Sequence, residues 1–220
     1  MKKWFILKGW NMKKIILCIL IFIMVSGLSA ASLIAHWTFD EGTGTNVNDS
    51  SGSNDSTLVG ASWSNDSPGG QLGKSVHFDG QDDYVEVVPL GGSLGIFDFR
   101  SSDDFSISIW VKPDRNTTNS PNGHNMRVWY IENEIGNRIQ LVVNEGGKTY
   151  FNMAGSGGTC ASPDTAFPVG VWSHIVTVKQ GNTFKIYRNS VDVSLGSGAA
   201  GDPAPSGSMF YIGAERNGTG

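Results

Sequence analysis

Acidic side chains in glycine-rich turns are the first residues of this sequence that could do chemistry. Asp79, Asp82 and Asp83 lie in one such turn, and Asp40 and Asp49 lie in two others. Carboxylate oxygens suit Ca²⁺, which takes about 6–8 oxygen ligands, many of them backbone carbonyls. The alternative is that these residues only form the turns, since Asp side chains accept hydrogen bonds from their own backbone. The spacing does not match a complete calcium-binding loop, so both interpretations stay open.

Aromatic and planar polar side chains gather in a second stretch. Sugar-binding sites combine such groups, so Trp129, Tyr130, Asn137 and Arg138 are candidate ligand-binding residues. For the first two of these, packing in a core is an equally good interpretation. Trp63 and Trp110 are other choices for a sugar site. Core packing is nevertheless the preferred interpretation for three tryptophans within strong strand patterns, namely Trp37, Trp110 and Trp172.

A pair of carboxylates, Glu132 and Glu134, could suggest glycoside hydrolysis. That reaction needs two carboxyl groups about 5–9 Å apart. We interpret both as solvated loop side chains instead, and His174 as a structural residue of a strand. The sequence also contains no nucleophile-elbow, phosphate-loop or metalloprotease-helix motif. It therefore predicts no enzyme and no catalytic residue.

Five Asn-x-Ser/Thr triplets without Pro at the middle position are candidate N-glycosylation sites. All lie in predicted loops, and a loop rich in Asn and Ser also generates such triplets by chance. They begin at Asn48, Asn54, Asn65, Asn116 and Asn217.

Residues 1–31 have the pattern of a secretory signal peptide. Lys13 and Lys14 precede an apolar run at 15–25, and small residues follow up to Ala31. The run is short for a membrane span, so contact with a membrane is expected only through this segment if it is not cleaved. The sequence therefore predicts a secreted or cell-surface protein.

Composition narrows the remaining classes of function. Among 220 residues there are 29 Gly and only 16% charged residues, a balance typical of short strands joined by glycine turns. The net charge of −4 provides no basic surface for nucleic acid. Cys160 is the single cysteine after the leader, so no internal disulfide is expected, and we interpret it as a loop cysteine without a role, although a reactive or intermolecular thiol is the alternative.

Apolar residues alternate in many short segments, which indicates an all-β protein. The clearest is 105–111, FSISIWV, and the stretch 72–88 predicts a hairpin of two strands joined by an acidic turn. Loops are expected at 46–56 and 154–169. The predicted strands cover 33–39, 57–63, 76–78, 84–88, 105–111, 128–131, 139–143, 149–153, 171–178, 184–188, 191–195 and 208–212.

Several motifs then occur in one order. They are HWTFDEGTG, DSSG, LGKSVHFDGQDDYVEV, FSISIWVKP, GVWSHIVTV, FKIYRNSVDV and MFYIGAERN. In this order and spacing, residues 33–217 closely resemble laminin G-like domains of the concanavalin A type. The resemblance implies an antiparallel two-sheet jelly-roll sandwich at 32–220, behind an apolar signal helix. It also implies a closing strand that the sequence does not reach before Gly220, so we expect the domain to be incomplete at its C-terminus.

The resemblance also implies a function. Such domains mostly bind glycans or proteins, and they often carry a structural calcium near the first and closing strands, for which Asp40 is the preferred ligand and Asp49 and Asp79 are weaker ones. Glucanases of this fold use a Glu-x-Asp-x-Glu pattern that is broken here at Asn133 and Gly136. We therefore expect a carbohydrate- or protein-binding module with a role in adhesion. A glycoside hydrolase and a structural spacer of a larger surface protein are the alternatives.

Overall fold

The computed structural model describes residues 32–69, 72–87, 97, 99, 102–114, 126–132, 138–144, 147–153, 158–162, 167–196 and 209–213. The predicted leader at 1–31 lies outside these residues. Ile34–Gly220 form one compact unit. Within the described part of the chain, no helix has the length and hydropathy required to cross a bilayer.

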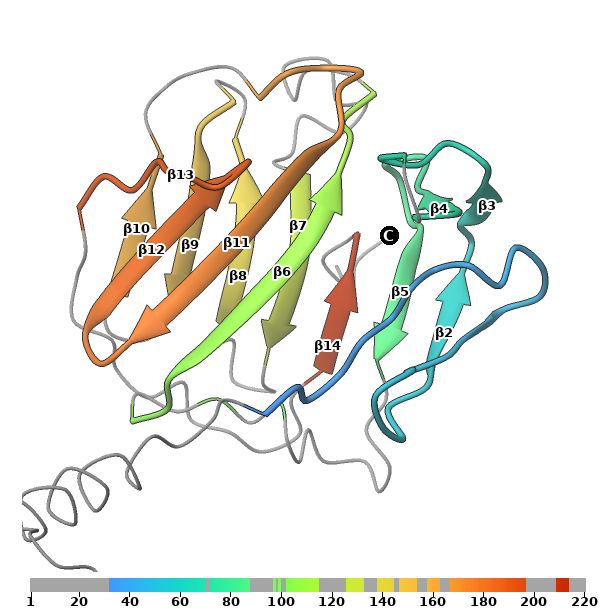
Figure 1. Ribbon diagram of the computed structural model, residues 1–220, viewed down its shortest axis with the longest axis horizontal. Coiled ribbons are helices and arrows are strands. Elements are labelled where there is room, and N and C mark those ends of the chain that lie inside the picture. Colours follow the sequence, from blue (N-terminus) through green and yellow to red (C-terminus); the bar gives the residue numbers. More distant parts are fainter. Residues whose placement is uncertain are drawn as a thin grey trace, which may run out of the picture. The chain divides into compact units, whose positions relative to one another are not determined.

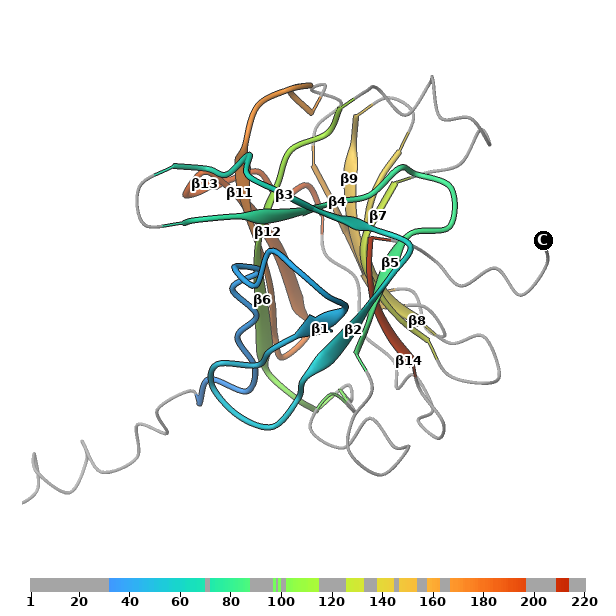
Figure 2. The same ribbon diagram turned by 90° about the vertical axis from the view of Figure 1, so that its right-hand side faces the viewer.

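Two antiparallel sheets stack face to face, as Figures 1 and 2 show. The larger sheet has eight strands in the order β1-β2-β5-β14-β7-β8-β9-β10. These strands are β1 (Asn46–Val47), β2 (Ser56–Val59), β5 (Tyr84–Val87), β14 (Met209–Ile212), β7 (Met126–Glu132), β8 (Arg138–Val143), β9 (Thr149–Met153) and β10 (Gly158–Ala161).

The smaller sheet has four strands in the order β13-β12-β11-β6, so β6 is one of its edges. These strands are β13 (Val191–Asp192), β12 (Thr183–Arg188), β11 (Ser173–Gln180) and β6 (Phe105–Val111). A third sheet pairs only β3 (Ser62–Ser64) with β4 (Ser75–His77). The arrangement agrees with the predicted all-β fold and is consistent with a jelly-roll sandwich.

The core lies between the two large sheets and is centred on Phe151 of β9, which is fully buried. Its ring contacts Trp129 of the same sheet at 5.8 Å between centroids, and Phe184 and Phe105 of the opposite sheet at 5.2 and 6.2 Å. Alternate residues of each strand point to this core, as the period of two in a strand requires. Large aromatic side chains therefore fix which face of each strand is internal.

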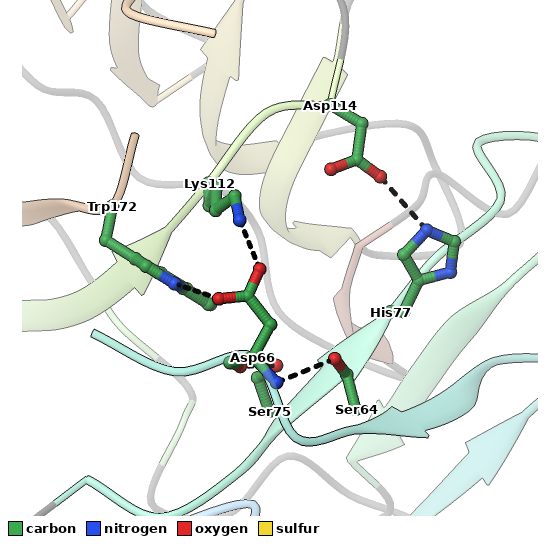
Figure 3. Close-up of polar contacts among 7 residues, drawn as sticks. All are labelled: Ser64, Asp66, Ser75, His77, Lys112, Asp114 and Trp172. Atoms are coloured by element: carbon green, nitrogen blue, oxygen red, sulfur yellow. Dashed lines mark hydrogen bonds and ion pairs between the residues drawn. The ribbon is translucent and has the colours of Figure 1, made fainter. Parts of the chain in front are cut away.

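Polar contacts attach the small third sheet to one end of the four-stranded sheet (Figure 3). Asp66, between β3 and β4, pairs with Lys112 just after β6 and accepts a hydrogen bond of 3.0 Å from the indole Nε1 of Trp172. These two hydrogen bonds hold the pKa of Asp66 below its ordinary value, with Lys112 the larger cause. Beside them, Nε2 of His77 lies 3.0 Å from Oδ2 of Asp114. Since these charges are exposed, the attachment depends on several weak contacts together.

The predicted hairpin at 72–88 is wrong. Its two strands exist, but β4 pairs with β3, whereas β5 pairs with β2 and β14 in the larger sheet. The acidic turn between them, in which Gly80 has a φ of 81°, moves the chain from one sheet to another. A local turn signal predicts a change of direction, but it does not identify the strands that pair on either side.

Other predicted segments differ from the structure in smaller ways. The segment 33–39 is not a strand: it forms a single bridge from Trp37 to Asp49, and Phe39 has a left-handed φ of 59°. Trp37 still packs on the core, against Phe97 and Phe210 at 6.0 Å each. The two predicted loops at 46–56 and 154–169 contain strands β1 and β10.

Gly213 directly follows β14 of the larger sheet and lies against Phe78, which directly follows β4 of the third sheet. Substitutions at Gly213 therefore test how closely these two segments pack. Its φ is 95°, and a Cβ added there would lie 2.5 Å from the ring of Phe78. Gly80 has a similar φ of 81° and open space around it. We expect Gly80→Ala to lower the free energy of unfolding by about 1–2 kcal/mol through its backbone alone. Gly213→Ala should cost at least about 1 kcal/mol more, because the ring must move.

Urea unfolding of both variants measures this difference. Equal losses in the two variants would mean that Phe78 does not pack against Gly213 as described.

Candidate functional site

On the outer face of the eight-stranded sheet, polar and aromatic side chains outnumber aliphatic ones such as Val59 and Val142. Along each strand, the residues that alternate with the core residues point to this side. We call this set the tyrosine face. It comprises Thr57, Tyr84, Glu86, Arg127, Tyr130, Glu132, Arg138, Gln140, Val142, Tyr150, Asn152 and Tyr211.

Strand register places four of these residues in one row. Tyr211 of β14 is opposite Tyr130 of β7, Tyr130 is opposite Gln140 of β8, and Gln140 is opposite Asn152 of β9. Neighbouring strands lie about 4.8 Å apart, so the row spans roughly 14 Å, which is comparable to a short oligosaccharide. The sequence could not predict this row, because it depends on pairing between strands far apart in the chain.

Aromatic rings on this face contact one another and a guanidinium group. The guanidinium carbon of Arg127 lies 5.6 Å from the ring centroid of Tyr130, within cation–π range. Tyr84 meets Tyr211 edge to face at 5.3 Å. As a result, Tyr130 and Tyr211 are almost fully buried, at 0% and 2% exposure, although they point away from the core.

Two amide side chains of the row have buried atoms without partners. Gln140 is 5% exposed, and its Oε1 accepts no hydrogen bond from the described residues. The buried Oδ1 of its neighbour Asn152 accepts none either. Leaving a buried acceptor unsatisfied costs about 1–3 kcal/mol, so two adjacent ones on one face call for an explanation.

The structure separates the predicted ligand-binding residues. Tyr130 and Arg138 both belong to the tyrosine face, whereas Trp129 points to the core and is 1% exposed. Asn137 lies outside the described residues. Sequence reasoning missed Gln140, Asn152 and Tyr211, for which strand alternation was the available signal.

Glu132, at the end of β7, is opposite Arg138 on the same face, while Glu134 lies outside the described residues. The interpretation of Glu132 as a loop side chain is therefore wrong: it is the last residue of a strand. The interpretation of Trp110 as a core residue is also wrong, because it is 42% exposed on the other sheet.

Of the predicted metal ligands, only Asp79 lies in a group of carboxylates within the described chain. One of its oxygens, one of Asp82 and one of Asp83 lie within 4.8 Å of one another. Such a donor set fits the preference of Ca²⁺ for hard oxygen ligands, with carbonyls and water needed to complete it. Asp40 lies elsewhere and accepts a hydrogen bond of 2.9 Å from the backbone of Lys74. Calcium binding stays a prediction for all three positions.

Asp49 is buried and ties the N-terminal segment to the following loop. Its carboxylate accepts hydrogen bonds from the backbone of His36, Ser51 and Asn54 and from the side chains of Ser51 and Asn54. Burial alone would raise the pKa of Asp49, but these donors together hold it well below its ordinary value. With both oxygens accepting hydrogen bonds, Asp49 acts in this structure as a connector of loops.

Among the glycosylation candidates, Asn65 is exposed in a turn and Asn48 is also exposed. The amide nitrogen of Asn54, where a glycan would attach, already donates to Asp49 at 2.7 Å. Asn116 and Asn217 lie outside the described residues. Modification stays a prediction at all five positions.

Cys160 is not the loop residue that the sequence suggested. It lies in β10, is fully buried and belongs to the core cluster. Burial raises the pKa of its thiol. A protonated, inaccessible thiol is a poor nucleophile, so the sulfur contributes packing and not reactivity.

Comparison with known proteins adds a family and a fold. The family model described as the concanavalin A-like lectin/glucanases superfamily matches residues 79–220. Domain 4 of AbnA, an extracellular arabinanase of family GH43 from Geobacillus stearothermophilus, solved in complex with arabinotriose, aligns with a TM-score of 0.58 at 20% identity over 84% of each chain.

The sialidase of Trypanosoma rangeli, solved with sialic acid, also aligns with a TM-score of 0.58, at 14% identity over 82% of this chain. The match spans only 27% of the sialidase's own length. At such identities these likenesses establish the fold alone. A search of curated proteins finds no match.

Asp49 gives a prediction of acid sensitivity. Because its pKa is lower in the folded than in the unfolded chain, its contribution is present above about pH 4 and is lost as the pH falls toward the folded pKa. We expect Asp49→Asn to lower the free energy of unfolding at pH 7 by about 3 kcal/mol, because several donors lose their acceptor. Its stability should then change less between pH 5 and pH 3 than that of the wild type.

Urea unfolding across this pH range measures both effects. Asp104→Asn is the matched control, since that exposed carboxylate accepts a hydrogen bond from the backbone N–H of Gly181. If the free energy of unfolding of Asp49→Asn still falls steeply between pH 5 and pH 3, other carboxylates cause the acid sensitivity.

Calcium binding at the acidic turn gives a second prediction. At a hundredfold excess over Kd, Ca²⁺ should stabilise the fold by about 2.7 kcal/mol and raise the melting temperature by roughly 5 °C. Asp82→Asn should abolish this shift, whereas Asp114→Asn, which removes an exposed carboxylate of a different loop, should preserve it. A calcium effect that survives Asp82→Asn would exclude this turn as the site.

Proposed function

The chain belongs to the concanavalin A-like lectin/glucanases superfamily, and from this premise we propose that it is a secreted or surface-displayed, non-enzymatic module that binds carbohydrate on its tyrosine face. The single observation that carries this proposal is the pair of unpartnered buried amide oxygens on Gln140 and Asn152. Sugar hydroxyls are hydrogen-bond donors of the size and number that two such adjacent acceptors require.

The aromatic residues of the same face support a sugar more than a peptide or an ion. A sugar ring has one apolar side of C–H groups and a rim of hydroxyls. Tyr84 and Tyr150, which are only half-buried, offer ring surface on the same face, Tyr130 and Tyr211 are buried next to the amides, and Arg127 adds a planar group. Few polar groups placed among aromatic ones are typical of small-molecule sites. Because the groups stand on strands, little ordering is needed on binding.

Fold neighbours and the leader support the remaining parts of the proposal. AbnA domain 4 carries arabinotriose in its structure, and it has this fold without being a whole enzyme. The leader pattern at 1–31 supports export, and display at the cell surface would then allow adhesion to glycans. Calcium bound at the acidic turn would stabilise the module.

The proposal is tested by removing the amide at Gln140 and keeping its shape. We expect Gln140→Met to weaken binding by about tenfold, because one or more hydrogen bonds to the sugar are lost. The melting temperature should stay equal or rise, since a buried unsatisfied acceptor disappears. Calorimetric titration with arabinotriose, xylotriose, cellotriose and sialyllactose, in calcium, measures the affinity. Gln180→Met, at the exposed end of β11, is the matched control.

Two outcomes would contradict the proposal. No binding to any of these sugars or to a broad glycan array would favour the structural-spacer alternative. Release of reducing ends from a polysaccharide, abolished by Glu132→Gln, would identify a glycoside hydrolase instead.

A further inference from the structure

Trp110 is the one aromatic residue in the described part of the chain whose side chain is exposed, at 42%. It stands on β6, on the outer face of the four-stranded sheet, with Ser106 and Ser108 at the alternate positions of the same strand. This face is on the opposite side of the sandwich from the tyrosine face. Burying an indole stabilises a fold, so an exposed one loses this stabilisation. The contacts of Trp110 show whether its side chain is held in a defined position.

Contacts with neighbouring side chains fix the orientation of the indole. His174 of β11 is directly opposite in register, and its ring stacks on the indole with centroids 5.0 Å apart and planes inclined by 29°. Ser108 Oγ lies 2.7 Å from Nε2 of His174 and fixes the imidazole in turn. The backbone N–H of His174 donates to Oδ1 of Asn189 at 2.9 Å. Trp110 is therefore preorganised on a rigid strand and not a loosely placed surface residue.

Part of the indole remains exposed, although the contacts of Asp66 with Lys112 and Trp172 hold the third sheet against this end of β6. His174 covers the side that faces β11, and β6 is the edge of its sheet (Figure 1), so among the described residues no strand stands against the remaining side. The loop that closes this end of β6, through a bond from Gly170 N to Pro113 O, exposes two further apolar side chains, Val169 and Val171. These valines add exposed apolar surface at the same end of the four-stranded sheet.

The charges on this face favour a neutral ligand. Lys185 and Asp192 pair with each other at 3.0 Å, so neither is a free charge for an ionic partner. Ser108 and the amide group of Asn189 are neutral polar groups, and each forms a hydrogen bond with His174. A flat indole bordered by hydroxyl and amide groups matches the two sides of a sugar ring, which are C–H surface and hydroxyl rim.

We propose that Trp110, backed by His174, forms a second carbohydrate-binding site that takes one ring of a neutral polysaccharide chain at the open edge of β6. The site does not depend on ligand binding by the tyrosine face. With both sites present, the module would hold one long chain at two points or connect two chains. Binding at two points raises the apparent affinity for polysaccharide far above that for a short oligosaccharide.

The test uses the full chain and two kinds of probe, soluble hexaoses (arabinohexaose, xylohexaose and cellohexaose) and the corresponding insoluble polysaccharides. Trp110→Ala should weaken retention on at least one polysaccharide by about tenfold or more, and one of two classes of site should disappear from calorimetric titration with its hexaose. Trp110→Phe should keep part of the affinity. His174→Ala, which removes the backing of the ring, should weaken binding less than Trp110→Ala does.

Gln140→Met separates this proposal from the one for the tyrosine face. If Trp110→Ala weakens carbohydrate binding and Gln140→Met does not, the second site is supported and the site on the tyrosine face is rejected. The reverse would reject the second site alone. Identical affinity and stoichiometry of Trp110→Ala and the wild type on every probe would overturn this inference, provided that circular dichroism shows the variant folded.

Discussion

The contact that the rest of this structure depends on is the packing of Phe151 against aromatic rings of both sheets. It joins β9 of the larger sheet to β6 and β12 of the smaller one through Phe105 and Phe184. Since side chains alternate along a strand, fixing one residue inward fixes its neighbours outward. Phe151 in the core therefore places Asn152 on the outer face, just as Trp129 in the core places Tyr130 there. Core packing and site geometry are two results of one constraint.

This dependence explains what the sequence could and could not reveal. The strand β6 has the predicted bounds, because FSISIWV alternates without interruption, and the same alternation puts Trp110 in phase with two serines and outside the core. The exposure of Trp110 could therefore have been predicted. The strand β7, MRVWYIE, has large residues in both phases, and only its pairing with β8 and β14 decides that Trp129 is internal. Pairing of that kind connects residues far apart in the chain and leaves no local signal.

The two outer faces of the sandwich differ in character. On the larger sheet, tyrosines, arginines and amides cover one another, so the face is crowded and its unsatisfied oxygens are buried. On the smaller sheet, one indole stands above serines, a histidine and a valine, with open solvent beside it. A crowded polar face selects a ligand by hydrogen bonds, while a flat aromatic one accepts many ligands by shape. One fold thus presents two physically different surfaces.

The burial of Cys160 has a consequence for the proposed export of this protein. Extracellular fluid is oxidising, and an accessible lone thiol there becomes cross-linked to other molecules or converted to a sulfenic acid. In β10 the sulfur sits within the core with no exposed surface, so oxidants do not reach it while the sandwich stays closed. The same atom would become reactive during thermal opening. The rate at which a thiol-specific dye reacts with Cys160 would therefore measure how often the sandwich opens, without any engineered label.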